Sequence, residues 1–498
     1  MTITQLEYTC FIPANLDLQA LLKAEFPTYT QKDYDHIALF LDFLCRGHIE
    51  KGKRRKKGIT KRAVPLCAKA LQYFTRDYKK YLDFLERAEV IKQVYTGVIG
   101  RGCSKYLFCE AYRGKQLNYY NLHDQKLILK IYSRYQDSDA IQMYPELFGH
   151  LMKVRVNIGL ATTILDEIYG KNDEVGRHLQ ESLIKRINDP RMATFVIGQT
   201  GRLTTTITNL HKKLRSTLRY KGKPLVGLDI KSSIPFFSIA MFLKHVFDGM
   251  NLQGLISSIN PNMLLTFMND TLKPNQINKQ EHPDILVSEY MMLVEIQKNL
   301  DSYPRVVQFI DLIVNGDIYS YIAELWNRTL STSYTRDTAK TRFLEILNSP
   351  PSRPSDEKII LLKEWPEVFT AIDEMNRDMY TTKNGITIKE RIVKGQLVPA
   401  KTIGKRTTND PVCLFAHFTQ RLEAHVILDI VCRGISKERP DIPLLTIHDS
   451  ILTTEEHAQY VKDFMEHHIY RVMGRKPTVV LERPWGKTKD ITKEQHRA

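Results

Sequence analysis

Long apolar runs, a secretion signal and paired cysteines are all absent from this 498-residue sequence. No stretch of about 18 uncharged apolar residues occurs, so no membrane-spanning helix is predicted. The first residues, MTITQLEYTCFIP, lack the basic and apolar regions of a signal peptide. The seven cysteines include no CxxC pair and are odd in number, which argues against a zinc site or a disulfide framework. These absences predict a cytoplasmic protein with reduced thiols and no membrane partner.

Acidic residues are in the minority. The 56 Asp and Glu stand against 72 Lys and Arg, which gives a formal charge of +16 and a pI near 9.3. This excess favours a polyanionic partner such as nucleic acid, although an anionic surface or solubility alone would also explain it. Repeats and low-complexity tracts are missing. A chain of this length with 43% apolar residues predicts a globular protein of two or three domains.

The first 115 residues predict a winged-helix-like domain. Helical apolar spacing occurs at 36–45, and further helices are expected at 63–71 and 75–88. Two antiparallel strands, at 90–91 and 105–109, follow with a Gly-rich connection. In such modules the second helix can enter the major groove of DNA. A winged helix that binds another protein is an equally good alternative.

Two further segments carry less information. The basic run Lys51–Lys57 is too repulsive to pack, so it predicts a loop that either contacts phosphates or is merely solvated. Residues 116–190 alternate charged and apolar positions and predict a mostly helical connector. No catalytic residue is predicted in this connector.

A single carboxylate, Asp229, stands at the end of a short apolar strand that begins at Leu225. A second apolar strand, within Pro443–Thr454, carries His448 and Asp449 into a tight turn. Two strand-end aspartates of this kind can hold a pair of Mg2+ or Mn2+ ions. Two ions about 3.5–4 Å apart activate an attacking oxygen and stabilise a leaving oxygen, which suits nucleotidyl transfer. Taken alone, each aspartate is more often a turn or cap residue.

From Gly198 the sequence runs GQTGRLTTTITNLHKKLRSTLRYKGKPLVGLDIKSSIPFF. This block resembles the palm of family A DNA polymerases and of the related single-subunit RNA polymerases. In that family a TGRL element, an Asn-Leu pair and a basic stretch precede the strand with the first metal aspartate. The resemblance implies that Arg202 and Asn209 bind the primer or template. It also implies that Asp229 and the main-chain carbonyl of Ile230 bind metal.

A second block, Gly316–Ala323 followed by Arg336–Leu347, looks like the fingers helix of this family with its R-x3-K motif. Arg336 and Lys340 are four residues apart, so they lie on one face of a helix. There they can grip the polyphosphate of an incoming nucleotide. Alone, such a pair is common on exposed helices.

A third block, Thr446–Ser450, matches the palm motif in which a His-Asp dipeptide occupies a hairpin turn. The resemblance makes His448 and Asp449 catalytic residues. Upstream, Phe415–Ala424 resembles the helix whose glutamine, here Gln420, touches the minor groove of the template-primer. All these elements occur in the family's order, and the resemblance covers about residues 190–498.

Four positions depart from the family pattern. The predicted nucleotide-binding Phe343 stands three residues after Lys340, where the family's aromatic stands four after it, and Asn348 replaces a later tyrosine. Ser450 replaces an acid of the DNA polymerases, as it does in the single-subunit RNA polymerases. Ile234 stands where DNA polymerases place a glutamate that excludes the 2′-hydroxyl, and its branched side chain can block a ribose sterically. The choice between dNTPs and rNTPs therefore stays open.

The resemblance implies an α+β right-hand polymerase, with a small antiparallel palm sheet and helical fingers and thumb. In this scheme residues 1–115 are the winged-helix-like domain, 116–190 the connector or thumb-like region, and 191–498 the palm and fingers. The implied function is DNA-directed DNA synthesis on a template-primer from nucleoside triphosphates. No exonuclease-like acidic cluster occurs in the first 190 residues, so proofreading is not expected. The alternatives are a single-subunit RNA polymerase or primase and, in another class, a non-catalytic winged-helix regulator.

Overall fold

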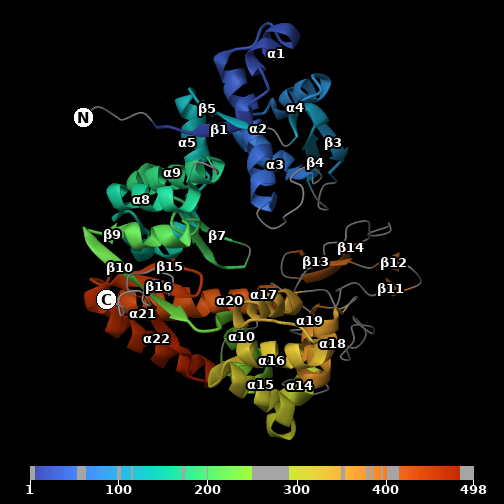
Figure 1. Cartoon of the computed structure of the whole chain (residues 1–498), viewed down its shortest axis with the longest axis vertical. Helices are drawn as coiled ribbons and strands as arrows, with labels where there is room; N and C mark the ends of the chain where they lie inside the picture. Colours follow the sequence, from blue (N-terminus) through green and yellow to red (C-terminus); the bar gives the residue numbers. More distant parts are fainter. Residues whose placement is uncertain are drawn as a thin grey trace. The chain divides into compact units, whose positions relative to one another are not determined.

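The computed structural model describes residues 6–52, 63–97, 103–113, 116–170, 174–198, 200–249, 291–348, 354–376 and 414–482, and four short strands between 382 and 400. Over these residues the chain is a mixed α/β protein in which every strand pair is antiparallel (Figure 1). Of the basic run Lys51–Lys57, residues 53–57 lie outside this set. No helix within these ranges is long and apolar enough to cross a membrane.

The chain divides into two compact units. Unit 1 consists of Met1–Asp139 and Leu165–Thr194, and unit 2 consists of Ala140–Ile164 and Phe195–Ala498. The two units therefore share the predicted connector 116–190. Its residues 140–164 belong to unit 2, and the remainder belongs to unit 1.

Unit 1 combines helices with two small sheets. In the first sheet β1 pairs with β5, and in the second the strands lie in the order β2-β4-β3. In chain order its elements are β1 (Thr9–Pro13), α1 (Leu18–Glu25), α2 (Gln31–Gly52), β2 (Val64–Leu66), α3 (Ala68–Phe74), α4 (Tyr78–Arg87), β3 (Ile91–Tyr95), β4 (Ser104–Phe108), β5 (Leu117–Asn121), α5 (Gln125–Ser133) and α9 (Glu174–Asn188). Helices α6 (Ser138–Met143) and α8 (Ile158–Tyr169) run across the division.

The second sheet of unit 1 corrects one expectation. The helix predicted at 63–71 is wrong in its first half, where β2 pairs with β4. Val64 and Leu66 are buried by this pairing while Pro65 between them is exposed. The ring of Pro65 disfavours the helical conformation at the preceding residue, Val64, because of steric clash. An extended strand is therefore the better local structure at Val64. Helix α3 begins only at Ala68.

Unit 2 is organised around a six-stranded sheet with the strand order β15-β16-β10-β9-β6, in which β17 also pairs with β10. Its elements up to residue 330 are α7 (Pro145–Leu151), β6 (Val154–Val156), β7 (Phe195–Ile197), β8 (Leu203–Thr205), β9 (Leu218–Tyr220), β10 (Lys223–Ile230), α10 (Ser233–Ser238), α11 (Lys244–Gly249), α14 (Met291–Lys298), α15 (Pro304–Val314) and α16 (Ile318–Leu330).

The remaining elements of unit 2 complete the sheet and add its helical cover. They are α17 (Arg336–Leu347), α18 (Asp356–Glu364), α19 (Pro366–Asn376), β11 (Thr382–Lys383), β12 (Ile386–Thr387), β13 (Lys389–Val393), β14 (Gln396–Ala400), α20 (Leu414–Ala424), a π-helical continuation (His425–Cys432), α21 (Arg433–Glu438), β15 (Leu445–Ile447), β16 (Ser450–Thr454), α22 (Ala458–Met473) and β17 (Val479–Glu482).

Strand β10 is the centre of the sheet. It pairs with β16 and with β17, and α22 packs against it. Its apolar run Leu225, Val226, Leu228 and Ile230 is buried, as expected of a strand that is covered on both faces. The next helix, α10, packs on α20. The end of β10 therefore lies beside elements that are distant in sequence (Figure 1).

Helices α16 to α19 form a second apolar core within unit 2. Trp326, Phe343, Trp365 and Phe369 are fully buried in it. At its edge, Glu357 accepts hydrogen bonds from the Arg342 guanidinium at 3.0 Å and the Tyr334 hydroxyl at 2.8 Å. Burial opposes ionisation, but hydrogen bonds, first from Arg342 and Ser355, lower the pKa of Glu357 to about 2.

We expect Glu357→Gln to reduce the acid sensitivity of unit 2. A depressed folded-state pKa contributes stability above the unfolded pKa, and this contribution is lost as the pH falls from about 5 toward 2. The variant should therefore be less stable than the wild type at pH 6, and the difference should shrink at pH 3. Urea unfolding at both pH values measures it. Glu345→Gln is the matched control, because Glu345 binds the same Arg342 but its side chain is 62% exposed; an equal change in both variants would contradict the expectation.

Candidate functional site

Asp229 and Asp449 are 220 residues apart in sequence and lie together in unit 2. Strands β10 and β16 pair antiparallel with Asp229 opposite Ser450. Asp449 immediately precedes Ser450 and is the second residue of the two-residue turn between β15 and β16. The Ser450 hydroxyl donates a hydrogen bond to Asp229 Oδ1. The hairpin thus brings the second aspartate to the end of the central strand.

The two carboxylates affect each other's ionisation. Burial, and then the negative charges of Asp229 and Glu423, raise the pKa of Asp449 to about 7. Burial also raises the pKa of Asp229, against the opposing effect of the Ser450 hydrogen bond, and Glu482 raises it further. Because like charges crowd this site, a cation bound between the aspartates would relieve their repulsion.

The oxygen donors of this site suit magnesium. Among the residues that the structure describes, no group of three or more His, Cys, Asp or Glu side chains is arranged to hold a metal ion. A cation at Asp229 and Asp449 would take its other ligands from water, substrate phosphates or a main-chain carbonyl such as that of Ile230. Mg2+ is commonly held in this way, by one or two carboxylates together with substrate phosphates.

A buried ion pair supports the aspartates from α20. Arg202 donates to both carboxylate oxygens of Glu423, at 2.8 and 2.7 Å, and the Ser233 hydroxyl donates to Oε2 at 3.0 Å. The Glu423 side chain is 1% exposed and that of Arg202 is 18% exposed. Burial raises the pKa of Glu423, against the opposing charge of Arg202, and the charge of Asp229 adds to the rise. Arg202, predicted to bind a primer, is therefore held by Glu423 in this structure.

Helix α17 contributes positive charge. The helix begins with a capping box, in which the side chains of Thr335, the N-cap, and Thr338 each bond to the backbone of the other residue. The Arg336 guanidinium and the Lys340 ammonium lie over the ring of Tyr319, 5.4 and 5.5 Å from its centroid. The charge of Lys340 also lowers the pKa of Asp229. The basic face of α17 and the first aspartate therefore belong to one site.

Tyr319 connects this helix to the aspartates. Its side chain is buried on α16, and burial raises its pKa to about 12. Its hydroxyl shares a hydrogen bond with Ser232, and the charge of Asp449 is close enough to raise its pKa further. Arg336 is additionally paired with Asp317, the N-cap of α16, through a 2.7 Å hydrogen bond. This pairing keeps the Arg336 side chain on the face that carries Lys340.

Two residues of the site have left-handed backbones. Ser232, between β10 and α10, has φ of 56°, and so does His448 in the β15–β16 turn. A two-residue hairpin turn requires a positive φ, which explains the conformation of His448. His448 is exposed at the surface, but the protein around its ring displaces enough water to lower its pKa, and the charges of Arg202 and Arg215 lower this pKa further.

The other predicted residues lie in different environments. Gln420 is half-buried on α20, one helical turn before Glu423, and Ile234 is half-buried in the first turn of α10. Asn209 is exposed in the turn that follows β8. Phe343 is fully buried, edge-on to Tyr319 and Phe369, so its ring packs in the helical core. The buried Phe343 does not present a face on which a base could stack.

No protein-family model matches the chain, and no curated protein matches it in sequence. Among solved structures it is similar to the POL domain of Pol1 from M. smegmatis, which was determined in complex with a DNA primer-template and dNTP. The identity is 13% and the TM-score 0.28, over 65% of this chain and 56% of that one. The chain thus covers little more than half of that domain. A similarity this low does not assign the chain to a family, so its function rests on the geometry of the site.

Sequence reasoning missed Glu423, Tyr319 and Ser233. Glu423 stands three residues after Gln420, so the two occupy the same helix face. This spacing is the feature of the sequence that could have indicated that Glu423 also belongs to the site. Tyr319 lies within the Gly316–Ala323 block, where one more aromatic residue suggests only packing. The contacts of Glu423 and Ser233 are made across 190 residues or more, which no local pattern predicts.

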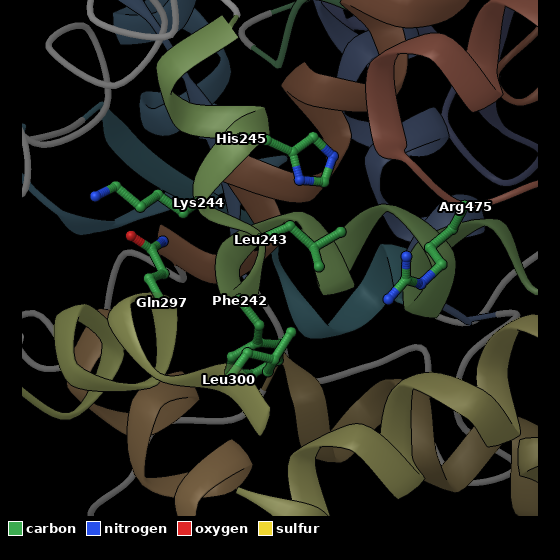
Figure 2. A pocket seen from close by; sticks show the side chains of 7 residues that line it. All are labelled: Phe242, Leu243, Lys244, His245, Gln297, Leu300 and Arg475. Atoms are coloured by element: carbon green, nitrogen blue, oxygen red, sulfur yellow. The ribbon is translucent and has the colours of Figure 1, made fainter. Parts of the chain in front are cut away.

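A separate cavity of about 410 Å³ opens elsewhere in unit 2 (Figure 2). It is lined by Phe242, Leu243, Lys244, His245, Gln297, Leu300 and Arg475. None of the predicted site residues is among them. The cavity is therefore distinct from the site at which the two aspartates meet.

Proposed function

We propose that this chain is a template-directed nucleotidyltransferase, most simply a DNA-directed DNA polymerase of the family A type that lacks proofreading. The observation that carries the proposal is the pairing of Asp229 with Ser450, which sets Asp449 beside Asp229. Two adjacent carboxylates, with the charge of Lys340 acting on Asp229 and Arg336 beside Lys340 over the Tyr319 ring, suit the transfer of a nucleotide from a triphosphate. In this proposal unit 2 contains the palm and fingers.

The aspartates would act by holding divalent ions, Mg2+ or Mn2+. When bound, such ions supply positive charge to the attacking and leaving oxygens. Ser450 fixes the orientation of the Asp229 carboxylate through its hydrogen bond. In the reaction the primer 3′-oxygen forms a bond to the α-phosphorus of the nucleotide, and the bond from that phosphorus to pyrophosphate breaks. His448, in the same turn as Asp449, borders this centre.

The basic face of α17 would bind the polyphosphate. Arg336 and Lys340 point across the ring of Tyr319, and the charge of Lys340 reaches Asp229. Positive charge at this position neutralises the pyrophosphate as it leaves. Ile234, half-buried after β10, would lie near the sugar of the nucleotide.

We expect Arg336→Ala and Lys340→Ala each to raise the KM for nucleotide about tenfold or more, because each removes a charge-assisted contact worth about 1.5–3 kcal/mol. Steady-state incorporation at varied nucleotide concentration measures this. The matched control is Arg328→Ala, which removes an exposed positive charge from the neighbouring helix α16. An equal rise of KM in the control would show that the effect comes from the loss of a positive charge anywhere in this region and not from a contact with the nucleotide.

Nucleic acid would bind through both units. In unit 2, Arg202, Asn209 and Gln420 are the proposed primer and template contacts, with Arg202 oriented by Glu423. In unit 1, the helices α3 and α4 followed by the β3–β4 hairpin support the winged-helix-like interpretation. Four exposed basic side chains on or beside these helices would favour phosphate contact, namely Lys69, Arg76, Lys79 and Lys80.

Primer extension tests the proposal. A labelled primer on a longer template is offered dNTPs and rNTPs separately, with Mg2+ or Mn2+. Template-dependent extension with dNTPs supports the DNA polymerase. Synthesis from rNTPs without a primer would instead favour a single-subunit RNA polymerase or primase, for which Ser450 and Ile234 already provide an argument. Nucleic-acid binding without any incorporation by the wild type would favour a non-catalytic regulator.

A further inference from the structure

Unit 1 holds two cysteines in adjacent positions. The antiparallel pairing of β2 with β4 sets Val64 opposite Tyr106 and Leu66 opposite Ser104. The same register, continued by one residue, sets Cys67 opposite Cys103. Opposed residues in an antiparallel pair have Cα atoms about 4.5–5.5 Å apart, and disulfides form at Cα separations of about 4.4–6.8 Å. The backbone at this end of the sheet therefore has the spacing of a disulfide.

The side chains of this pair are also directed toward each other. The Cys67 and Cys103 thiols share a hydrogen bond. Cys67 is exposed and Cys103 is half-exposed, whereas Cys10, Cys45 and Cys432 are buried. Solvent oxidants can thus reach the pair but not those three thiols. Unlike a single reactive cysteine, this pair has a second thiol in position to resolve a first oxidation product.

We propose that Cys67 and Cys103 are an oxidation site that forms a reversible intramolecular disulfide with hydrogen peroxide as the oxidant. The hydrogen bond between the thiols lowers the pKa of Cys67 and raises that of Cys103, so Cys67 is the attacking group. The Cys67 thiolate attacks one peroxide oxygen, the O–O bond breaks, and the departing hydroxide takes a proton to become water. Cys67 is then a sulfenic acid.

In the second step Cys103 attacks the Cys67 sulfur. The S–S bond forms, the S–O bond breaks, and the hydroxyl leaves as water with the Cys103 proton. Overall, two thiols and one peroxide give one disulfide and two waters. The bond would close residues 67–103, which contain α3, α4 and β3, into a covalent loop. This inference does not depend on the proposed function, because neither step involves a nucleotide or a nucleic acid.

The test treats the reduced full-length chain with hydrogen peroxide, removes the peroxide, and then denatures and alkylates the chain for thiol counting and non-reducing peptide mapping. The seven thiols are expected to fall to five, with one cross-linked peptide that joins Cys67 to Cys103, and dithiothreitol should restore all seven. Cys103→Ser should stop at a Cys67 sulfenic acid that a dimedone probe captures. Cys109→Ser, which removes a half-exposed thiol next to β4, should form the cross-link as the wild type does.

Two results would overturn the proposal. One is a wild-type chain in which Cys67 and Cys103 are alkylated separately, or remain unoxidised, after peroxide treatment that oxidises a free model thiol. The other is a disulfide that joins Cys67 to Cys109 or to a second molecule. Because peptide mapping of the wild type decides both points, the conclusion does not rely on any variant being folded.

Discussion

Replacing Asp229 or Asp449 by asparagine is expected to lower nucleotide incorporation by at least about 10³-fold, without weakening DNA binding. Each substitution removes a negative charge from the pair of carboxylates that would hold the divalent ions. A loss of about 4 kcal/mol of transition-state stabilisation corresponds to this change in rate. Single-turnover extension of a primer by one nucleotide measures the rate, and filter binding measures the affinity for DNA.

Asp311→Asn is the matched control for these variants. It makes the same chemical change at an exposed position of α15 in the same unit, so its incorporation rate should equal that of the wild type. Wild-type incorporation by Asp229→Asn or Asp449→Asn would reject the assignment of that residue. A loss of DNA binding in parallel with incorporation would point to a structural defect instead.

Glu423→Ala is expected to destabilise unit 2 by about 3 kcal/mol. The substitution leaves the Arg202 guanidinium and the Ser233 hydroxyl without the carboxylate that both now bind. Removing one partner of a buried ion pair costs about 3–5 kcal/mol, and Arg202 retains some access to water, which places the effect at the lower end. The midpoint of urea unfolding, followed by a probe in unit 2, measures the change.

Glu456→Ala provides the control for this second substitution. Glu456 also binds a basic side chain, Lys223, but its own side chain is 44% exposed and that of Lys223 is 64% exposed. An exposed pair of this kind contributes less than about 1 kcal/mol. The Arg202→Ala/Glu423→Ala double variant should lose less stability than the sum of the two single losses. Equal, small losses for Glu423→Ala and Glu456→Ala would show that the buried pair does not stabilise unit 2.

Short motifs that resemble those of the polymerase family, together with one apolar run, predicted the elements that bear the site. The predicted range Arg336–Leu347 is the observed α17, and the predicted helix Phe415–Ala424 differs from α20 by one residue. The strand before Asp229 and the turn at His448 and Asp449 are also confirmed. These elements are predictable because the motifs and the apolar run that indicate them each span only a few residues.

Contacts over long sequence distances were not predictable in the same way. Glu423 in isolation looks like a solvated charge on a helix, and it is buried only because Arg202, 221 residues away, neutralises it. The strand at Val64–Leu66 forms because β4 is available to pair with it. Phe343 was expected near a nucleotide, but the neighbouring helices α16 and α19 enclose it. In each case the tertiary partner decides the outcome.

The most direct test of the central claim is the incorporation rate of the Asp229→Asn/Asp449→Asn double variant beside each single variant. If the two carboxylates form one centre, removing the second after the first lowers the rate little further. The rate of the double variant should therefore be within about tenfold of the rate of the less active single variant. Losses that multiply would mean that the aspartates act independently. The wild-type rate is the reference for all three variants. A single variant that keeps the wild-type rate would contradict the claim that the two aspartates form one catalytic centre.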